Sequence, residues 1–470
     1  MKNFLNVVIL IFCVCLNWCY NTEGGAEEKE GVKVDSYTIQ ASSLFPSSSS
    51  CVLSSKAASN TKSSLRVVHL HGPCSHLRSN KDARLDHDEI LRGDQARVES
   101  IRFKLSKNNS NGSVSTTKST ELPGKLGSTF GSANYIVTIG IGTPKNDVSL
   151  IFDTGSDLTW TQCKPCLGTY RCYTQNEPIF DPSSSSSYQN VPCSSPMCEN
   201  GPQSCSASNC LYRVKYGDNS FTEGFLAKER FTLTNSDVLD DVYFGCGENN
   251  HGLFFRTAGI LGLGRDKLSI PSQTSSTYNN IFSYCLPSSA SNTGHLTFGS
   301  DGISESVKFT QVSSFPSPSN YGIDIVGISV GDTKLDITPT SFSEKGAIID
   351  SGTVVSRLPT RIYEELRTVF KEKMSSYKAT SGYEIFDTCY DFTGVDTMTI
   401  PKIAFSFGGG TVVELDVNGM LYPLSMSQVC LAFAGDDDSP AIFGNVQQKT
   451  MEIVYDVAGG RVGFAPHGCS

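Results

Sequence analysis

From Tyr135 onward the chain consists of short apolar runs that are separated by Gly, Asn and Ser. The clearest runs are "YIVTIGIGTP", "DVSLIFD", "LYRVKYGD", "GFLAKERFTL", "DVYFGCG", "HLTFG" and "YGIDIVGISVG". Runs of this length, rich in β-branched and aromatic residues and bounded by turn-forming residues, are typical of strands joined in hairpins. We therefore predict an all-β fold for this part of the chain.

Two segments have helical spacing instead. In "TRIYEELRTVFKEKM" four apolar side chains share one face, and Thr360 is the expected N-cap. These side chains are Ile362, Leu366, Val369 and Phe370. Further upstream, "RLDHDEILRGDQARVESIRFKL" carries apolar residues at roughly helical spacing. The Ser- and Asn-rich run that follows is typical of an exposed linker, and its two sequons predict glycosylation at Asn108 and Asn111.

The chain begins with "MKNFLNVVILIFCVCLNW", in which one Lys precedes an apolar run to about Leu16. This pattern predicts a secretory signal peptide over residues 1–20, because the run is short for a membrane span and polar, acidic sequence follows. A signal anchor is the alternative. No later stretch is apolar enough to span a bilayer, and the C-terminus lacks the apolar tail of a lipid-anchor signal. We expect a secreted protein with no membrane anchor.

Seventeen cysteines suit an exported chain, and twelve of them lie between Cys163 and Cys469. An even number of cysteines in an exported domain predicts a disulfide framework. The pair Cys163 and Cys166 alone suggests zinc or redox chemistry, but no second pair or His-x-x-x-His completes a zinc set. We therefore expect neither a metal nor a cofactor.

Charge is divided unevenly along the chain. The first 127 residues carry 16 Lys and Arg against 12 Asp and Glu, whereas the remainder carries 22 against 35. A basic leader on an acidic body predicts that charge attraction holds the two together near neutral pH. An acidic body of this kind also argues against nucleic-acid binding.

Two acids follow buried-strand patterns in the same way. In "SLIFDTGSDLTW" three apolar residues precede Asp153, and "GAIIDSGTVVSRL" repeats the design at Asp350. Each element is followed by an apolar-apolar-Gly element, which holds Leu261 in "AGILGLGR" and Phe443 in "PAIFGNV". Two matched pairs in the same order predict duplicated lobes.

Lobes packed about a pseudo-twofold axis would bring Asp153 and Asp350 together. Two carboxylates a few ångströms apart share one proton over a wide acidic range, because both cannot ionise cheaply. The ionised member can take a proton from water while the protonated member polarises a carbonyl, which is general acid–base hydrolysis of an amide. The alternative is two capping aspartates at unrelated turns.

The residues after each acid fit this chemistry. A glycine allows a close approach of the backbone. The hydroxyl residue before the glycine can bond across to the opposite lobe, and the one after it can bond the outer carboxylate oxygen. These residues are Thr154, Gly155 and Ser156 after Asp153, and Ser351, Gly352 and Thr353 after Asp350.

With "DTGS" and "DSGT" as active-site signatures, the chain from about Ser128 to its C-terminus resembles pepsin-type aspartic endopeptidases. In detail it resembles their atypical, nepenthesin-like group from plants. The resemblance implies an all-β, bilobal pepsin-like fold with the active site in the cleft between two duplicated lobes. In "VKYGDNSFTEG", Tyr216 falls at the tyrosine of a flap over the cleft, and Trp160 falls at the tryptophan that supports it. The implied substrate-binding residues are Gly155, Ser156, Tyr216, Gly217, Asp218, Gly352 and Thr353.

The resemblance also implies a domain organisation and a disulfide pattern. A propeptide and linker would cover residues 21–127, an N-terminal lobe with a Cys-rich insert residues 128–310, and a C-terminal lobe residues 311–470. The implied disulfides are Cys163–Cys166, Cys172–Cys246, Cys193–Cys210, Cys198–Cys205, Cys285–Cys469 and Cys389–Cys430. Spacing alone does not select among the many alternative pairings.

Together these observations predict a monomeric, acid-active endopeptidase that cleaves proteins or peptides and is made as a zymogen. The apoplast is the expected location, with the vacuole as the alternative. Four basic leader residues are expected to pair with acids near the cleft: Arg97, Arg102, Lys104 and Lys107. "HLHGPCSH", from His69 to His76, could sense pH or bind a metal, although a local structural role is simpler. The alternative function is a non-catalytic pepsin-fold binding protein, such as a proteinase or glycanase inhibitor.

Overall fold

The structure is a computed structural model that describes residues 35–45, 50–54, 63–77, 86–109, 135–166, 171–199, 204–216, 220–252, 254, 256–338, 341–342 and 345–469. The predicted signal peptide, the sequon at Asn111 and the flap residues Gly217 and Asp218 lie outside these residues, and Asn108 falls in the last turn of a helix. Among the described residues, no helix combines the length and apolar character needed to cross a bilayer.

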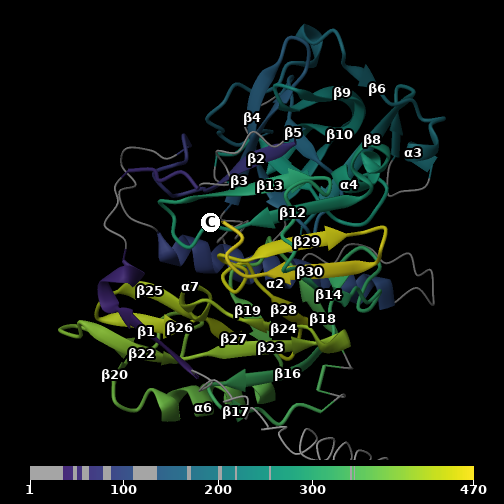
Figure 1. The fold of residues 1–470 in the computed structure, drawn as a ribbon. Coiled ribbons are helices and arrows are strands. Elements are labelled where there is room, and N and C mark those ends of the chain that lie inside the picture. Colours follow the sequence, from purple (N-terminus) through teal and green to yellow (C-terminus); the bar gives the residue numbers. More distant parts are fainter. Residues whose placement is uncertain are drawn as a thin grey trace, which may run out of the picture. The chain divides into compact units, whose positions relative to one another are not determined.

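The largest sheet has 15 strands and runs β14-β30-β29-β12-β13-β2-β3-β4-β11-β5-β10-β9-β8-β7, with β6 beside β9 (Figure 1). Its strands are β2 (Ser64–His69), β3 (Tyr135–Ile141), β4 (Asn146–Asp153), β5 (Trp160–Gln162), β6 (Gln189–Asn190), β7 (Ser204–Ser206), β8 (Asn209–Lys215), β9 (Phe221–Thr234), β10 (Asp237–His251), β11 (Gly259–Gly262), β12 (Ile281–Cys285), β13 (Thr293–Phe298), β14 (Lys308–Gln311), β29 (Glu452–Asp456) and β30 (Arg461–Ala465).

Four smaller sheets run β15-β18-β28-β19-β27, β17-β16-β23-β24, β20-β21-β26-β25 and β1-β22. Their strands are β1 (Ser36–Gln40), β15 (Tyr321–Gly322), β16 (Ile325–Val330), β17 (Thr333–Lys334), β18 (Ala347–Ile349), β19 (Ser356–Leu358), β20 (Lys378–Thr380), β21 (Cys389–Asp391), β22 (Thr397–Pro401), β23 (Ile403–Phe407), β24 (Val412–Glu414), β25 (Leu421–Ser425), β26 (Gln428–Leu431), β27 (Phe433–Gly435) and β28 (Ala441–Phe443).

The helices are few and mostly short. They are α2 (His87–Asn109), α3 (Pro196–Glu199), α4 (Ile270–Gln273), α5 (Ser275–Tyr278), α6 (Thr360–Lys373) and α7 (Val417–Met420), with 3-10 turns η1 (Ala41–Leu44), η3 (Pro182–Ser184) and η4 (Gly408–Gly410). The prediction of an all-β fold with two β-rich lobes is therefore confirmed. Both predicted helices are present as α2 and α6, but Thr360 is not the N-cap of α6. Pro359 takes that position, and the Thr360 N–H donates to Asp437 Oδ1 at 2.8 Å.

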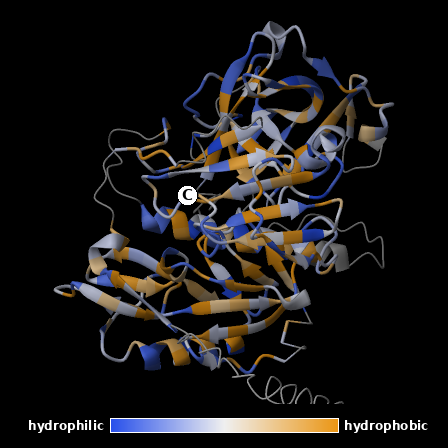
Figure 2. Ribbon diagram, in the orientation of Figure 1, coloured by the Kyte–Doolittle hydropathy of each residue, from blue (hydrophilic) through white to orange (hydrophobic). Residues whose placement is uncertain are grey.

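The two lobes are joined through the large sheet, because β12 of the N-terminal half pairs with β29 near the C-terminus. Aromatic residues fill this junction: the rings of Phe282 and Tyr455 stack 4.6 Å apart, and Tyr321 meets Tyr455 at 4.4 Å. In Figure 2 orange apolar residues lie along the strands of both lobes and of this junction. The burial of this apolar surface fixes the lobes against each other.

The leader is built into both lobes. Strand β2 lies between β13 and β3 in the large sheet, and β1 pairs with β22 at the edge of the other lobe. Helix α2, drawn in dark blue in Figure 1, passes between the upper and lower groups of strands. Its apolar face is buried against the body, with Ile90 and Leu91 beside Val354 and Val355.

The structure contains seven disulfides among its described residues. They are Cys51–Cys74, Cys163–Cys246, Cys166–Cys172, Cys193–Cys205, Cys198–Cys210, Cys285–Cys469 and Cys389–Cys430. The last two were implied by the resemblance. The other four implied pairings, Cys163–Cys166, Cys172–Cys246, Cys193–Cys210 and Cys198–Cys205, are wrong, and the leader bond between Cys51 and Cys74 was not foreseen.

Strand register explains the corrections. Strands β5 and β10 run parallel with Thr161 beside Cys246, which brings the Cα atoms of Cys163 and Cys246 to 5.3 Å. Cys205 and Cys210 face each other across the β7–β8 hairpin, and each bonds to a cysteine that precedes the hairpin. Such long-range register is not encoded in cysteine spacing.

We predict that peptide mapping of the non-reduced protein finds Cys163 joined to Cys246 and Cys166 joined to Cys172. The reason is geometric, since these pairs meet the Cα separation that a disulfide requires. Cys389–Cys430 serves as the internal control, because it links directly opposed residues of β21 and β26. Recovery of a peptide closed by a Cys163–Cys166 bond would contradict the strand register.

Candidate active site

Asp153 and Asp350 stand at equivalent places in the two lobes. Asp153 ends β4, and Asp350 directly follows β18. Strand β11 pairs in parallel with β4 and places Leu261 beside Phe152, while β28 pairs in parallel with β18 and places Phe443 beside Ile349. The predicted pairing of each acid-bearing element with a later apolar-apolar-Gly element is therefore confirmed.

Backbone and hydroxyl groups cross-link the two acid-bearing loops. The Thr154 N–H donates to Ser351 Oγ at 3.1 Å, and the Ser351 N–H donates to Thr154 Oγ1 at 2.9 Å. All four groups are buried, so each hydrogen bond satisfies a donor that water cannot reach. This reciprocal pair fixes the distance between the loops.

The glycines permit the close approach of the loops. A Cβ atom at Gly155 would lie 2.8 Å from Asp350 Oδ1, and one at Gly352 would lie 2.6 Å from Asp153 Oδ1. Real Cβ contacts do not reach such distances, and Arg97 Nη2 would lie closer still to a Cβ at Gly155. A side chain at either glycine would therefore collide with the facing carboxylate and with the Arg97 guanidinium.

Each carboxylate accepts hydrogen bonds from its own loop. The donors are the hydroxyl three residues on, which the sequence predicts, and the N–H two residues on, which it does not. They are Gly155 N–H at 2.9 Å and the Ser156 hydroxyl for Asp153, and Gly352 N–H at 3.3 Å and the Thr353 hydroxyl at 2.7 Å for Asp350. Both acids are buried, at 2% and 0% exposure.

Arg97 of helix α2 lies between the two acids. Its Nη2 donates to Asp153 Oδ1 at 2.7 Å and to Asp350 Oδ1 at 3.0 Å, and its Nε donates to Asp350 Oδ2 at 3.1 Å. The guanidinium is itself buried. The sequence predicted that Arg97 pairs with acids near the cleft, and its partners are the acid pair itself.

Opposite charges in this site shift the pKa values of Asp350 and Arg97. Burial alone would raise the pKa of Asp350, but the charge and hydrogen bonds of Arg97, with those of Thr353 and Gly352, hold it below its ordinary value. Burial would lower the pKa of Arg97, and the negative charges of Asp153 and Asp350 raise it instead. One cation therefore compensates two anions in a site without room for bulk water.

The other basic leader residues differ in their contacts. Arg102 forms half-exposed ion pairs with Asp436 at 3.6 Å and Asp438 at 3.3 Å. The side chains of Lys104 and Lys107 lie outside the described part of the chain. A partly exposed pair such as that of Arg102 contributes little to stability on its own.

Sequence reasoning missed a second buried ion pair of the leader. Asp94, one turn before Arg97, accepts a hydrogen bond from Arg357 Nη2 at 2.7 Å and another from the Val354 N–H at 2.7 Å. Asp94 is fully buried, and so is Arg357. The spacing of Asp94 and Arg97 on one buried helix face was a signal available in the sequence.

Tyr216, which the resemblance implies to be the flap tyrosine, lies beside Trp160. Trp160 Nε1 donates to the Tyr216 hydroxyl at 2.9 Å, and the Trp160 ring meets Phe254 at 4.9 Å. All three rings are buried. Trp160 therefore anchors the base of the β8–β9 hairpin in the N-terminal lobe.

Such a two-lobed fold with paired aspartates defines the pepsin-like class. The family descriptions "Xylanase inhibitor N-terminal" and "Xylanase inhibitor C-terminal" match residues 135–300 and 320–466. The structure is similar to the crystal structure of edgp (TM-score 0.59, 21% identity, 72% of this chain and 93% of that one). It is also similar to basic 7S globulin from soybean (TM-score 0.57, 19% identity, 70% and 91%). These structures share the fold.

Relatives of higher identity define the family. The chain is 74% identical to aspartyl protease AED1 from Arabidopsis thaliana over 470 residues, which cover 100% of this chain and 99% of that protein. It is 37% identical to aspartic proteinase nepenthesin-1 from Nepenthes gracilis over 352 residues, 72% of this chain and 79% of that one. The chain therefore belongs to the atypical, nepenthesin-like plant aspartic proteases. It is an aspartic-type endopeptidase, and its substrates are peptides.

We predict that Ser351→Ala lowers the free energy of unfolding by about 1–3 kcal/mol, because the buried Thr154 N–H loses its acceptor. Urea unfolding of the full chain measures the change. Ser425→Ala is the matched control, since Ser425 is exposed and bonds only a neighbouring hydroxyl. Equal unfolding midpoints for the two variants would show that the cross-link contributes nothing.

Proposed function

We propose that the protein is a secreted aspartic endopeptidase, made as a zymogen, in which a water activated between Asp153 and Asp350 attacks the peptide bond. The observation that carries this proposal is the buried pair of carboxylates, matched in hydrogen bonding and held together by a single cation from the leader. The relatives named as aspartyl proteases support it. The signal-like N-terminus supports secretion to the apoplast or vacuole, and we propose a monomer.

The chemistry begins when Arg97 departs. Without its charge the two carboxylates repel each other, so the pair takes up one proton on acidification. The ionised member then removes a proton from water, and the protonated member donates to the carbonyl oxygen of the substrate. Hydrogen bonds from Ser156 and Thr353 keep the outer carboxylate oxygens oriented throughout.

Arg97 supports the zymogen proposal because its Nη2 fills the space that the attacking water needs. An atom that donates to Oδ1 of both Asp153 and Asp350 excludes a water at the same place. Activation then requires removal of α2. We propose that residues 21–127 form this propeptide, with cleavage between Leu122 and Gly131, and that lobes of residues 128–310 and 311–470 remain.

Two groups make the docked leader sensitive to acid. The pKa of Asp350 is lowered beside Arg97. Ionised Asp350 therefore stabilises the docked leader at a pH above the pKa that this carboxyl has without the leader. This stabilisation is lost as pH falls through the lowered pKa. Burial, with charges of His71, Lys449 and His87, lowers the pKa of His69, whose Nδ1 accepts the His71 N–H at 3.3 Å. Docking is therefore also weakened as pH falls below the ordinary His value of about 6.5.

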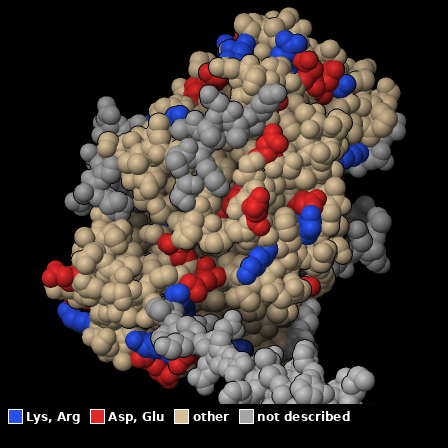
Figure 3. Space-filling view, in the orientation of Figure 1, with Lys and Arg blue, Asp and Glu red and all other residues tan. Residues whose placement is uncertain are grey.

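The inhibitor alternative is not favoured. The matching family descriptions refer to xylanase inhibitors, but both aspartates, both glycines and all four hydroxyl residues of the loops are present here. The face seen in Figure 3 carries acidic and basic side chains in small mixed groups, without one dominant basic patch. We therefore retain the protease assignment and propose no nucleic-acid partner.

We predict that Asp153→Asn or Asp350→Asn abolishes proteolysis of a denatured protein at acidic pH. Each change removes a proton shuttle at constant shape and costs at least about 10²–10⁴-fold in kcat. The double variant should be no worse than either single one, because the two acids act as a unit. Near-native turnover by Asp350→Asn would exclude the proposed pair, and circular dichroism controls for folding.

We predict that the Arg97→Gln precursor is converted at a higher pH than the unaltered precursor, because two buried carboxylates lose their only cation. Removing one partner of a buried pair typically costs about 3–5 kcal/mol. Incubation over a pH series, followed by sequencing of the new N-terminus, measures conversion. Arg92→Gln, an exposed change on the same helix, is the control. An unshifted conversion pH for Arg97→Gln would contradict the inhibitory role of α2.

A further inference from the structure

A leader carboxylate already occupies a set of donors beside the acid pair. Asp94 Oδ1 accepts the Val354 N–H at 2.7 Å, and its Oδ2 accepts Arg357 Nη2 at 2.7 Å and the Val355 N–H at 3.4 Å. Each oxygen of the Asp94 carboxylate thus accepts from at least one donor, and Arg357 supplies a charge opposite to that of the carboxylate. We call Val354, Val355 and Arg357 the carboxylate cradle.

The cradle belongs to the body, and contacts within the body hold its residues in place. Arg357 Nη1 donates to the Val355 carbonyl at 2.7 Å within the same segment. Strand β19 is held on both sides, where Arg357 lies opposite Ile442 of β28 and beside Ala434 of β27. The carbonyl of Val354 accepts the Val446 N–H at 3.0 Å. Departure of Asp94 therefore leaves a fixed guanidinium and two N–H groups without their acceptor.

The internal duplication places Arg357 at the cleft. Arg357 stands seven residues after Asp350, and Trp160 stands seven residues after Asp153. The strand partners also match, because Trp160 lies opposite Ile260 of β11 and beside Gly245 of β10. Trp160 contacts the flap tyrosine from its lobe. Its counterpart Arg357 is thus positioned to meet a bound peptide from the other lobe.

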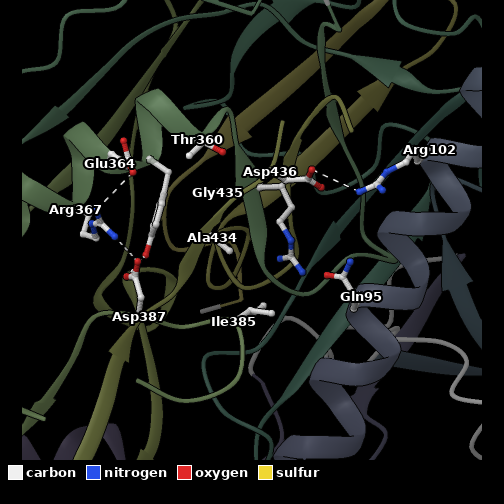
Figure 4. Close-up of a pocket in the computed structure, with 12 residues that line it drawn as sticks. Gln95, Arg102, Thr360, Glu364, Arg367, Ile385, Asp387, Ala434, Gly435 and Asp436 are labelled. Atoms are coloured by element: carbon white, nitrogen blue, oxygen red, sulfur yellow. Dashed lines mark hydrogen bonds and ion pairs between the residues drawn. The ribbon is translucent and has the colours of Figure 1, made fainter. Parts of the chain in front are cut away.

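A cavity adjoins the cradle. It has a volume of ≈ 430 Å³ and is lined by Arg357 and by residues of both the body and the leader. In Figure 4 Gln95 and Arg102 project from α2 on one side, and Glu364 and Arg367 project from α6 on the other. Because α2 forms one wall, its departure opens the cavity at the cradle.

The acids of the body around this cavity have partners of their own. Asp387 pairs with Arg367, and Glu364 lies 3.9 Å from the same guanidinium. Asp436 accepts the Ser439 hydroxyl and the Asp438 N–H, each at 2.7 Å, so it retains donors when Arg102 leaves. These acids already have partners, so after Asp94 departs the cradle is available to a carboxylate from outside the body.

We propose that, in the activated enzyme, the cradle binds the carboxylate of an Asp or Glu side chain of the substrate, so that Arg357 is a specificity-determining residue. The inference rests on the proposed function. A buried guanidinium without an anion is costly, and a carboxylate restores both its charge balance and the two N–H acceptors. An amide side chain supplies one acceptor oxygen and no charge. Asp94 in the precursor holds the place of this substrate side chain.

The test uses the full chain after acid conversion and pairs of peptides that carry a single Asp or Asn at each position near the scissile bond. At one position we expect kcat/KM at pH 5 to be about tenfold or more higher for the Asp peptide, as one charged hydrogen bond typically gives. The ratio should fall towards one by pH 3, because the substrate carboxyl protonates near pH 3.9. This measurement requires no variant.

Variants then assign the preference to the cradle. Arg357→Gln should lower the Asp-over-Asn ratio of kcat/KM to about one, and Arg357→Lys should keep part of the ratio. A purely structural role would instead lower kcat/KM on both peptides equally. As a second readout, a synthetic peptide of residues 86–109 should inhibit the activated enzyme, and Asp94→Asn should weaken it about tenfold. Glu99→Gln, an exposed change on the same helix, is its control.

The outcomes separate the two proposals. Absence of cleavage of every peptide overturns the proposed function and this inference with it. Cleavage with equal kcat/KM for all Asp and Asn pairs overturns the inference alone. A ratio that survives in Arg357→Gln also overturns it, since another group would then bind the carboxylate. Loss of the ratio in Arg357→Gln, with part of it kept in Arg357→Lys, supports the cradle.

Discussion

The structure depends on the electrostatic cost of holding two carboxylates together inside a protein. Asp153 and Asp350 are buried, and their loops are fixed by the reciprocal bonds of Thr154 and Ser351, so neither acid can move away from the other. In such a place the pair must be compensated by a cation or by a proton. In this structure the leader supplies the cation in Arg97. In the proposed activated enzyme a proton takes its place, so the two proposed states differ mainly in which of these compensates the pair.

This constraint explains why the leader is built so deeply into the body. A single exposed ion pair would not hold it, since such pairs contribute little. Instead β2 pairs on both sides within the large sheet, α2 buries an apolar face, and two ion pairs one helical turn apart are removed from water. Burial makes the docking strong near neutral pH, and the same burial makes it depend on protonation.

Structural features that repeat along the chain could be predicted from the sequence. The two acid-bearing elements and their later partners recur in order, so the duplication, the loop roles and the contact of Arg97 with acids of the cleft could be inferred from pattern and charge. The cysteine pairings could not, because Cys163 meets Cys246 through the parallel register of β5 and β10, which no spacing encodes. Asp94 was missed for a related reason. Its partner Arg357 lies 263 residues away in the sequence, and no sequence pattern shows that the two side chains meet.

The duplicated lobes are most informative where they differ. Both lobes have the same strand pairing seven residues after the acid, but one carries Trp160 and the other Arg357. The Trp160 indole bonds the Tyr216 hydroxyl and packs against Phe254, whereas Arg357 is buried in an ion pair with Asp94 of the leader. A buried guanidinium without an anion is costly. Under the proposed activation Asp94 departs with the leader, and the carboxylate of a substrate, as proposed above, then restores the charge balance of Arg357.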